Sequence, residues 1–472
     1  MATTRQQTEG QGPTLEVSEL DQLLHKEFKP RSDAAKEAVE TAVRTLAQEA
    51  LSQTTLISAD AIATIESIVA AIDKKLTEQV NLIIHHKEFQ ELEGTWRGLQ
   101  YLVTNTETDE MLKIRIFNIS KPELGRTLKR FKGTAWDQSP IFKKVYEQEY
   151  GMFGGEPLGC ITGDYFFDHS APDTELLGQM AQISAAAHCP FIAGASPALM
   201  QMESWQELSN PRDLTKIFGT PEYAPWRSLR EAEDSRYIGL AMQGATHEKF
   251  TWVNSAYAMA VNVTRSFKLY GWCSRIRGVE SGGVVEGLPV HTFPTDDGGV
   301  DMKCPTEIAI SDRREAELAK NGFMPLLHRK NSDLAAFIGA QSLQKPFEYV
   351  DPDATANANL SARLPYLFAC CRFAHYLKCI VRDKIGSFKE RDTMEKWLNN
   401  WIIQYVDGDP VNSSEETKSR KPLAAAEVKC EEVEGNPGYY RATFWLRPHY
   451  QLEGLTVSLR LVSKVPSVKT GA

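Results

Sequence analysis

The chain has 472 residues, which is too long for one ordinary hydrophobic core, so about two to three domains are expected. Hydrophobic residues (42%) and charged residues (24%) occur at the levels of a globular protein, and the net charge of −9 argues against broad binding to nucleic acid. No apolar run reaches the roughly 20 residues of a membrane span and residues 1–10 lack the apolar core of a signal peptide, so we expect a cytoplasmic protein without membrane insertion.

The first predicted element is a short amphipathic helix at residues 18–28, after a polar tail that we expect to be disordered. Ser18 is a typical helix cap, and Pro30 ends the pattern. The apolar stripe of this helix consists of Leu20, Leu23, Leu24 and Phe28. So short a helix is unstable alone. It therefore either docks on its own chain or binds a groove elsewhere, and the sequence leaves both open.

Long helices are predicted between residues 31 and 93, which contain neither Gly nor Pro. One apolar stripe there has helical spacing and consists of Ile62, Ile65, Val69, Ile72, Leu76, Val80 and Ile83. A further helical face carries Phe89, Leu92, Trp96, Leu99 and Leu102. The first stripe favours packing against another helix or a sheet.

From residue 112 onward, strand and helix patterns alternate. Strands are predicted at residues 112–116, 158–167, 190–193, 237–242 and 307–310. Helices are predicted from Ser120, at residues 172–187 and at residues 253–270. Residues 295–299 have the composition of a hairpin turn. This alternation predicts an α/β (α+β) fold, in which helices flank a mixed sheet.

The C-terminal part is predicted to be helical at residues 346–406, then a polar loop at 407–422, then three strands at 427–433, 439–447 and 455–463. The last two strands alternate with period two. Their apolar faces carry Ala442, Phe444 and Leu446, and Leu455, Val457, Leu459 and Leu461. A two-stranded ribbon is marginal alone. It either joins the sheet of its own domain or completes a sheet with strands of other chains.

Candidate catalytic and metal sites are weak. Ser196 in Gly-Ala-Ser-Pro-Ala is similar to the nucleophile elbow of serine acyl hydrolases, but Pro197 lacks the N–H that the oxyanion hole needs, and a helix cap explains the same residues. In the acidic segment 163–169, Asp164, Asp168 and His169 could hold a cation, but a loop satisfied by its own hydrogen bonds is the more common arrangement. The glycine-rich segment 278–283 lacks the motifs of a phosphate-binding loop and of a dinucleotide site. The eight cysteines have neither disulfide-framework nor zinc spacing. We therefore expect no enzyme activity, no metal and no cofactor.

Four segments together resemble the large subunit of the contractile sheath of bacterial type VI secretion systems, the TssC or VipB family. They are Glu93-Gly-Thr-Trp-Arg-Gly-Leu-Gln-Tyr101, residues 163–169, Gly278-Val-Glu-Ser-Gly-Gly-Val-Val-Glu-Gly-Leu-Pro289 and Leu446-Arg-Pro-His-Tyr-Gln-Leu-Glu-Gly-Leu-Thr-Val-Ser-Leu-Arg-Leu-Val-Ser463. Each segment is weak alone. Together and in this order they are specific, and they span about residues 58–465.

The resemblance implies a structural subunit that pairs with a small sheath subunit (TssB/VipA-like) and polymerises with further copies of itself. The resulting helical tubule surrounds an inner tube (Hcp-like), docks on baseplate components, and contracts to propel the tube and its effectors. An AAA+ unfoldase (ClpV-like) then disassembles it. The resemblance places strand exchange on Phe444, Leu446 and the closing strand, and unfoldase binding on the helix with Leu20. The alternative from another class is a serine acyl hydrolase that uses Ser196, and a third possibility is a non-polymerising adaptor.

The same resemblance gives three expected regions. Residues 1–57 form a flexible tail with the unfoldase-recognition helix. Residues 58–370 form the sheath α/β domain. Residues 371–472 form a C-terminal sheath domain that ends in the strand-exchange ribbon.

Overall fold

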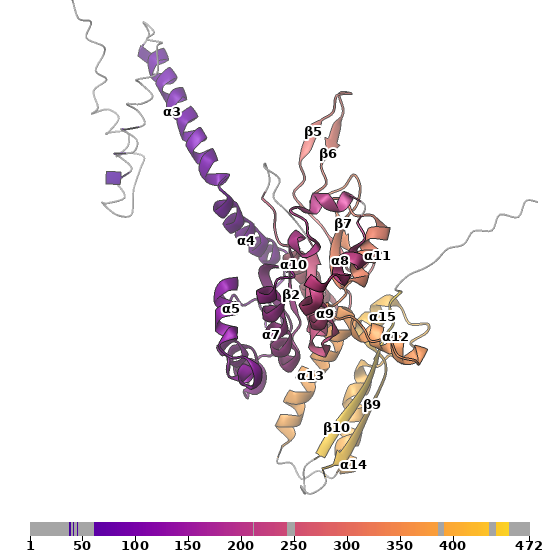
Figure 1. The fold of residues 1–472 in the computed structure, drawn as a ribbon. Coiled ribbons are helices and arrows are strands. Elements are labelled where there is room, and N and C mark those ends of the chain that lie inside the picture. Colours follow the sequence, from indigo (N-terminus) through magenta and orange to yellow (C-terminus); the bar gives the residue numbers. More distant parts are fainter. Residues whose placement is uncertain are drawn as a thin grey trace, which may run out of the picture. The chain divides into compact units, whose positions relative to one another are not determined.

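The computed structural model describes residues 61–210, 212–242, 251–385, 391–433 and 440–452, together with residues 37, 38, 41 and 45. The chain divides into two compact units, residues 1–91 and 92–472. In the first unit the predicted long helix is α3 (Ala61–Ile84; Figure 1). Where its side chains are described, the apolar stripe lies at the surface, since Val69, Val80 and Ile83 are each half exposed.

Helix α4 (Lys87–Thr104) reaches into the second unit and packs there through small residues. Gly94, Gly98 and Leu102 are buried, whereas Trp96 on the predicted apolar face is 63% exposed. The prediction of this face was therefore only partly right: Leu99 and Leu102 pack inward, but the closest approach to the body is made by two glycines.

A mixed six-stranded sheet forms the centre of the second unit, with the strand order β1-β2-β3-β7-β8-β4. Its strands are β1 (Ile161–Phe167), β2 (Phe191–Ala195), β3 (Ile238–Met242), β7 (Phe323–His328), β8 (Ala335–Phe337) and β4 (Val284–Val285). The first four run parallel, and the last two join antiparallel. Strands β2 and β3 are buried throughout, as expected for parallel strands covered on both faces. The predicted fold class is confirmed.

Helices cover both faces of this sheet (Figure 1). Helix α7 (Ala171–Ala187) packs on one face, and α10 (Ser255–Tyr270) and α13 (Leu364–Lys384) pack on the other. The remaining helices around the sheet are α5 (Lys121–Lys129), α6 (Pro140–Phe142), α8 (Leu214–Gly219), α9 (Ala224–Glu231), α11 (Asp312–Lys320) and α12 (Pro352–Ser361). Ser120 caps α5 as predicted, and its hydroxyl accepts a hydrogen bond from the N–H of Glu123.

The described C-terminal part adds helices α14 (Arg391–Ile402) and α15 (Glu415–Arg420) and strands β9 (Leu423–Glu432) and β10 (Tyr440–Pro448). The predicted hairpin is present as β5 (Thr292–Pro294) and β6 (Val300–Met302). Helix α15 corrects the prediction of a polar loop over 407–422, because Ser414 caps this helix by accepting a hydrogen bond from the N–H of Thr417 at 3.3 Å.

Two predicted strands are absent from the structure. Residues 112–116 and 307–310 alternate in sequence, but neither segment pairs with another strand in the described part of the chain. In the second segment, Ile308 and Ile310 pack on the core of the sheet domain, so its alternation reflects loop side chains that pack inward. The first segment is considered below.

A buried histidine lies where α13 meets the end of α7. The Nε2 atom of His375 lies 2.9 Å from the carbonyl oxygen of Ala187, and its ring packs edge-on against Tyr150 at 5.2 Å between centroids. Burial lowers the pKa of His375 from 6.5 to about 4, and the nearby cations Arg372 and Lys378 act in the same direction. His375 is therefore neutral in the folded protein at neutral pH, and Nε2 carries the proton that it donates to Ala187.

Acid should destabilise the protein through this residue. Unfolding lets His375 bind a proton at its ordinary pKa of 6.5, whereas the folded state resists protonation down to about pH 4. The unfolded state thus binds more protons in this window, and the free energy of unfolding falls by about 3 kcal/mol as pH drops through it. His375→Gln keeps a donor for Ala187 but does not titrate. Urea denaturation between pH 7 and 4 should show a smaller loss of stability for this variant than for the unaltered protein. An equal loss would contradict the role of His375 in acid destabilisation.

Candidate assembly surface at the C-terminal ribbon

Strands β9 and β10 form a two-stranded antiparallel ribbon in which Phe444 lies opposite Val428. Along β10 every second side chain is exposed, and Ala442, Phe444 and Leu446 are the ones directed inward. The predicted division of this strand into two faces is confirmed. Figure 1 shows the ribbon beside α14, away from the six-stranded sheet.

The inward face of the ribbon packs on an aromatic cluster. Phe373 and Leu377 of α13 and Leu398 and Ile402 of α14 form this cluster with Trp272. The Trp272 and Phe373 rings lie 4.5 Å apart. A ribbon that buries one face against helices has the neighbour that an isolated hairpin lacks. The ribbon is therefore held by its own chain through side-chain packing.

The outer edge of β9 is closed by side chains of α14. The amide nitrogen of Asn399 donates to the carbonyl of Val428 at 2.9 Å, and its oxygen accepts from the N–H of Val428 at 3.0 Å. The N–H of Cys430 donates to a carboxylate oxygen of Glu395 at 2.8 Å. These bonds replace those that another strand would make, so β9 cannot accept a further strand along this stretch.

The outer edge of β10 remains open in the described part of the chain. Because Val428 and Cys430 direct their N–H groups away from β10, the residues opposite them, Phe444 and Ala442, direct theirs away from β9. No described residue pairs with this edge, since β9 is the one neighbour of β10 there. The open edge thus carries backbone donors and acceptors, and this is the arrangement that accepts an added strand.

The chain leaves the ribbon through a fixed anchor. The N–H of Gln451 donates to the Tyr366 hydroxyl at 2.9 Å, and its side-chain amide donates to the carbonyl of Ser274 at 2.8 Å. The Nε of Arg277 donates to the side-chain oxygen of Gln451 at 2.8 Å. The backbone beyond β10 is therefore tied to the sheet domain before residue 453.

The glycine-rich segment supports this anchor. Gly278 has φ +74° and donates to the carbonyl of Phe337 at 2.7 Å. A Cβ atom at Gly283 would lie 2.5 Å from that same carbonyl oxygen, so only glycine fits there. This turn positions Arg277 so that it donates a hydrogen bond to Gln451. The sequence singled out the segment as a motif but not its role, and nothing in its composition points to Gln451.

The predicted site residues fall into two groups. Phe444 and Leu446 lie together in β10 and pack inward. The other predicted residues lie outside the described part of the chain: Leu20, Leu23, Leu24, Phe28, Leu455, Val457, Leu459 and Leu461. Sequence reasoning missed Asn399 and Glu395, because a polar residue on an amphipathic helix gives no sign of a strand edge beside it.

Ser196 is a helix cap, as its proline neighbour predicts. Its hydroxyl accepts a hydrogen bond from the N–H of Ala198 at 3.3 Å at the start of a short 3₁₀ turn, and Pro197 occupies the first position of that turn. This geometry explains the sequence without a nucleophile.

Asp168 and His169, just after β1, make contacts within the chain. Asp173 accepts hydrogen bonds from the Lys121 ammonium at 2.6 Å and from the N–H of Asp168 at 2.9 Å. His169 stacks on Tyr223 at 4.3 Å between centroids. Among the described residues no cluster of His, Cys, Asp and Glu is arranged to hold a metal ion.

The cysteines are free thiols. Cys189 and Cys371 are buried, and burial raises the pKa of both well above its ordinary value, which makes them poor nucleophiles.

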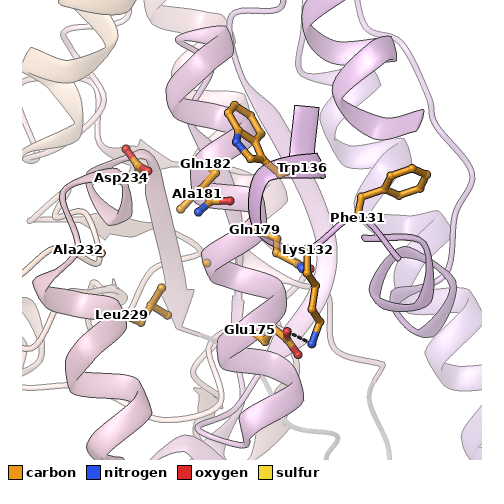
Figure 2. Close-up of a pocket in the computed structure, with 12 residues that line it drawn as sticks. Phe131, Lys132, Trp136, Glu175, Gln179, Ala181, Gln182, Leu229, Ala232 and Asp234 are labelled. Atoms are coloured by element: carbon orange, nitrogen blue, oxygen red, sulfur yellow. Dashed lines mark ion pairs between the residues drawn. The ribbon is translucent and has the colours of Figure 1, made fainter. Parts of the chain in front are cut away.

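A cavity of about 370 Å³ lies against α7 (Figure 2). Glu175 forms an ion pair with Lys132 at one side of it, and Asp234 lies on the opposite side. The other lining side chains are apolar or amide groups, among them Trp136 and Gln179. The charged groups of the lining are thus Lys132 and Glu175, which pair with each other, and Asp234.

Comparison with known proteins identifies the family of this chain. Residues 66–243 and 241–344 match the family model described as EvpB/VC_A0108, tail sheath N-terminal domain, and residues 353–465 match EvpB/VC_A0108, tail sheath gpW/gp25-like domain. The chain belongs to this tail sheath family. The type VI secretion system sheath protein TssC1 of Pseudomonas aeruginosa (strain PAO1) is 72% identical, with 99% of each chain covered.

Membership at this level of identity makes the chain a structural subunit of a type VI contractile sheath. Two solved structures are remotely similar. An anti-feeding prophage baseplate structure has a TM-score of 0.37 at 10% identity and covers 61% of this chain and 65% of its own. The contracted helical sheath of that prophage has a TM-score of 0.31 at 12% identity and covers 62% and 67%. No helix among the described residues of the sheath chain has the length and apolarity to cross a bilayer.

Proposed function

We propose that this sheath subunit pairs with a small sheath subunit (TssB/VipA-like) and that the pairs polymerise into a helical tubule through strand exchange at the C-terminal ribbon. The open edge of β10 carries this proposal, because β9 is closed by Asn399 and the edge of β10 has no partner among the described residues. The closing strand, residues 455–463, would leave the Gln451 anchor and pair with a neighbouring subunit.

Backbone pairing suits a lattice that changes shape. Strand-to-strand hydrogen bonds fix two chains to each other, while the side-chain contacts between subunit bodies re-pack. The anchor at Gln451 would transmit force from the exchanged strand to the sheet domain through Arg277 and Tyr366. The subunit acts mechanically in this proposal and catalyses no reaction.

Further partners follow from the same function. The tubule would surround an inner tube protein (Hcp-like) and dock on baseplate components in the cytoplasm. An AAA+ unfoldase (ClpV-like) would bind the helix with Leu20, Leu23, Leu24 and Phe28. In this proposal residues 1–57 serve recognition, residues 58–370 form the sheath domain, and residues 371–472 form the exchange domain.

Replacing Val457 and Leu459 together by Asp should abolish tubules. Both side chains belong to one face of the closing strand, and two carboxylates there would be buried without partners in an exchanged sheet. Electron microscopy of the chain co-expressed with its small subunit should show soluble pairs and no polymer. Intact tubules from this variant would show that the sheath assembles without strand exchange.

The matched control places the same double change at Leu23 and Leu24. This variant should form normal tubules but lose binding to the unfoldase in a pull-down. Undiminished binding would remove the helix from that role. If the unaltered proteins form stable pairs and never tubules, the chain is a non-polymerising adaptor.

A further inference from the structure

Helix α5 carries an exposed cationic face that its own chain leaves unpaired. Arg126, Lys129 and Arg130 are all exposed. They are three and four residues apart in α5 and its C-terminal cap, so they lie on one side of the helix. The chain has no acid from Arg126 to Lys132, and among the described residues only Lys132 of this stretch forms an ion pair, with Glu175. The other three cations have no carboxylate partner in the described part of the chain.

The opposite side of α5 holds this cationic face in place. Leu124 and Leu128 are buried in the core of the sheet domain, and the Ser120 hydroxyl caps the start of the helix. Glu123 is the one acid in the sequence of α5, and it forms no ion pair with a described residue. The cations are therefore carried by a fixed helix, and their face is preorganised before a partner binds.

The hairpin of β5 and β6 has the complementary charge. Asp296, Asp297 and Asp301 are exposed, and no cation among the described residues pairs with any of them. Two hydrogen bonds define the turn between the strands. The N–H of Thr295 donates to the carbonyl of Gly299 at 2.9 Å, and the N–H of Gly299 donates to the Thr295 hydroxyl at 3.1 Å. The three carboxylates thus project from a turn and a strand of defined conformation.

This hairpin receives little support from the rest of the described chain. Its two strands form a sheet separate from the six-stranded sheet (Figure 1). None of its side chains belongs to the hydrophobic cores of the described residues, and Phe293 and Val300 are exposed. A two-stranded ribbon is marginal alone. A neighbouring molecule that contacts the hairpin would therefore stabilise it.

We propose that the β5–β6 hairpin of one sheath subunit docks on the cationic face of α5 in the next copy of this chain. Each surface presents three charges of one sign, and neither surface is paired within the described part of its own chain. One exposed ion pair contributes little, so the contact depends on several pairs together. Two different surfaces of one chain form a heterologous contact, which repeats from copy to copy and builds an open helical array. This inference rests on the proposed polymerisation and adds a second contact to strand exchange.

A zero-length cross-link tests the contact in the unaltered protein. A carbodiimide activates a carboxylate, and a lysine amine in contact with that carboxylate then forms an amide bond. In tubules, Lys129 should become linked to Asp296, Asp297 or Asp301. Tubules mixed from isotopically heavy and light copies should give heavy–light peptide pairs, because the contact joins different copies. Tubules without this link, or with links only inside one copy, would overturn the proposal.

Charge reversal tests the contact by a second route. Reversing the three aspartates of the hairpin, or the three cations of α5, should raise the concentration of subunit pairs that tubules need at least roughly tenfold. All six side chains are exposed, so both variants should fold, which urea denaturation checks. The hairpin variant is Asp296→Lys with Asp297→Lys and Asp301→Lys, and the α5 variant is Arg126→Glu with Lys129→Glu and Arg130→Glu.

A chain with both reversals is the matched control, because it has the net charge of the unaltered protein. Its two surfaces are again complementary, so tubules should form within about twofold of the original concentration. Such recovery would support direct contact, since a second set of changes does not repair a damaged fold. If the combined variant assembles no better than the single reversals, or if only one single reversal has an effect, the two surfaces do not meet and the proposal fails.

The outcomes separate this inference from the proposed function. Normal assembly of both single-reversal variants, with tubules lost on replacing Val457 and Leu459 by Asp, would overturn the docking and leave strand exchange intact. If the unaltered pairs form no tubules, the cross-link in concentrated pairs decides. Links from Lys129 to the hairpin of another copy would then support docking without a tubule, and their absence would overturn it.

Discussion

Asn399→Ala should lower the free energy of unfolding by about 2 to 4 kcal/mol, because it leaves two backbone groups of one buried residue without partners. The Asn399 amide bonds both the N–H and the carbonyl of Val428, whose side chain is fully buried. Water has poor access to this edge, which faces α14. Urea denaturation should show the loss, and exchange of the Val428 amide should accelerate.

The neighbouring residue provides the control. Asn400 lies on the same helix but is exposed, so Asn400→Ala should change stability by no more than about 0.5 kcal/mol. The comparison isolates the bonds to β9 from the effect of alanine on helix propensity. Equal effects of the two substitutions would mean that the edge of β9 does not depend on Asn399. The Asn399 variant should also expose a second strand edge and so increase aggregation.

Several features of the fold could be predicted because their sequence signals are local. Alternation in residues 439–447 gave the two faces of β10, and Ser196 with Pro197 gave a cap. Residues 112–116 show the limit of such signals. Lys113 and Arg115 pair with Glu156 on one side and Ile114 packs inward on the other, so the alternation reflects a loop held on two sides. Strand pairing needs a neighbour, and alternation carries no information about one.

The sequence patterns did not predict contacts made by glycine and polar side chains, which belong to no apolar stripe. Gly94 and Gly98 bring α4 against the body of the domain, yet glycine reads as a weak point in a helix. Gln451 lay within a recognised segment, but its partners Ser274 and Tyr366 are far away in sequence. Sequence patterns report which face of an element is apolar; they do not report how closely two backbones approach.

Gly98→Ala should destabilise the docking of α4 although alanine is the better helix former. A Cβ atom at this position would lie 2.4 Å from Cδ2 of Tyr257 and 2.8 Å from Cγ1 of Val253. The Tyr257 ring is buried, so it cannot move aside freely. Overpacking costs about 1 to 3 kcal/mol, while the gain in helix propensity is about 0.5 to 1 kcal/mol. The cost of the clash therefore exceeds the gain in helix propensity, and the variant should be less stable.

Gly125→Ala in α5 is the matched control, because the nearest atom to a Cβ there is a Leu176 methyl at 4.0 Å. With space available, only helix propensity acts, and this variant should be stabilised by about 0.5 to 1 kcal/mol. The two substitutions should shift the urea midpoint in opposite directions. This would show that the close approach of the backbones, and not helix propensity, decides the stability of the α4 contact. Because Ile114 packs against Tyr257 in the same cluster, a loss at Gly98 should also loosen the segment 113–118. If both glycines responded alike, the close contact between α4 and α10 would not be present in solution.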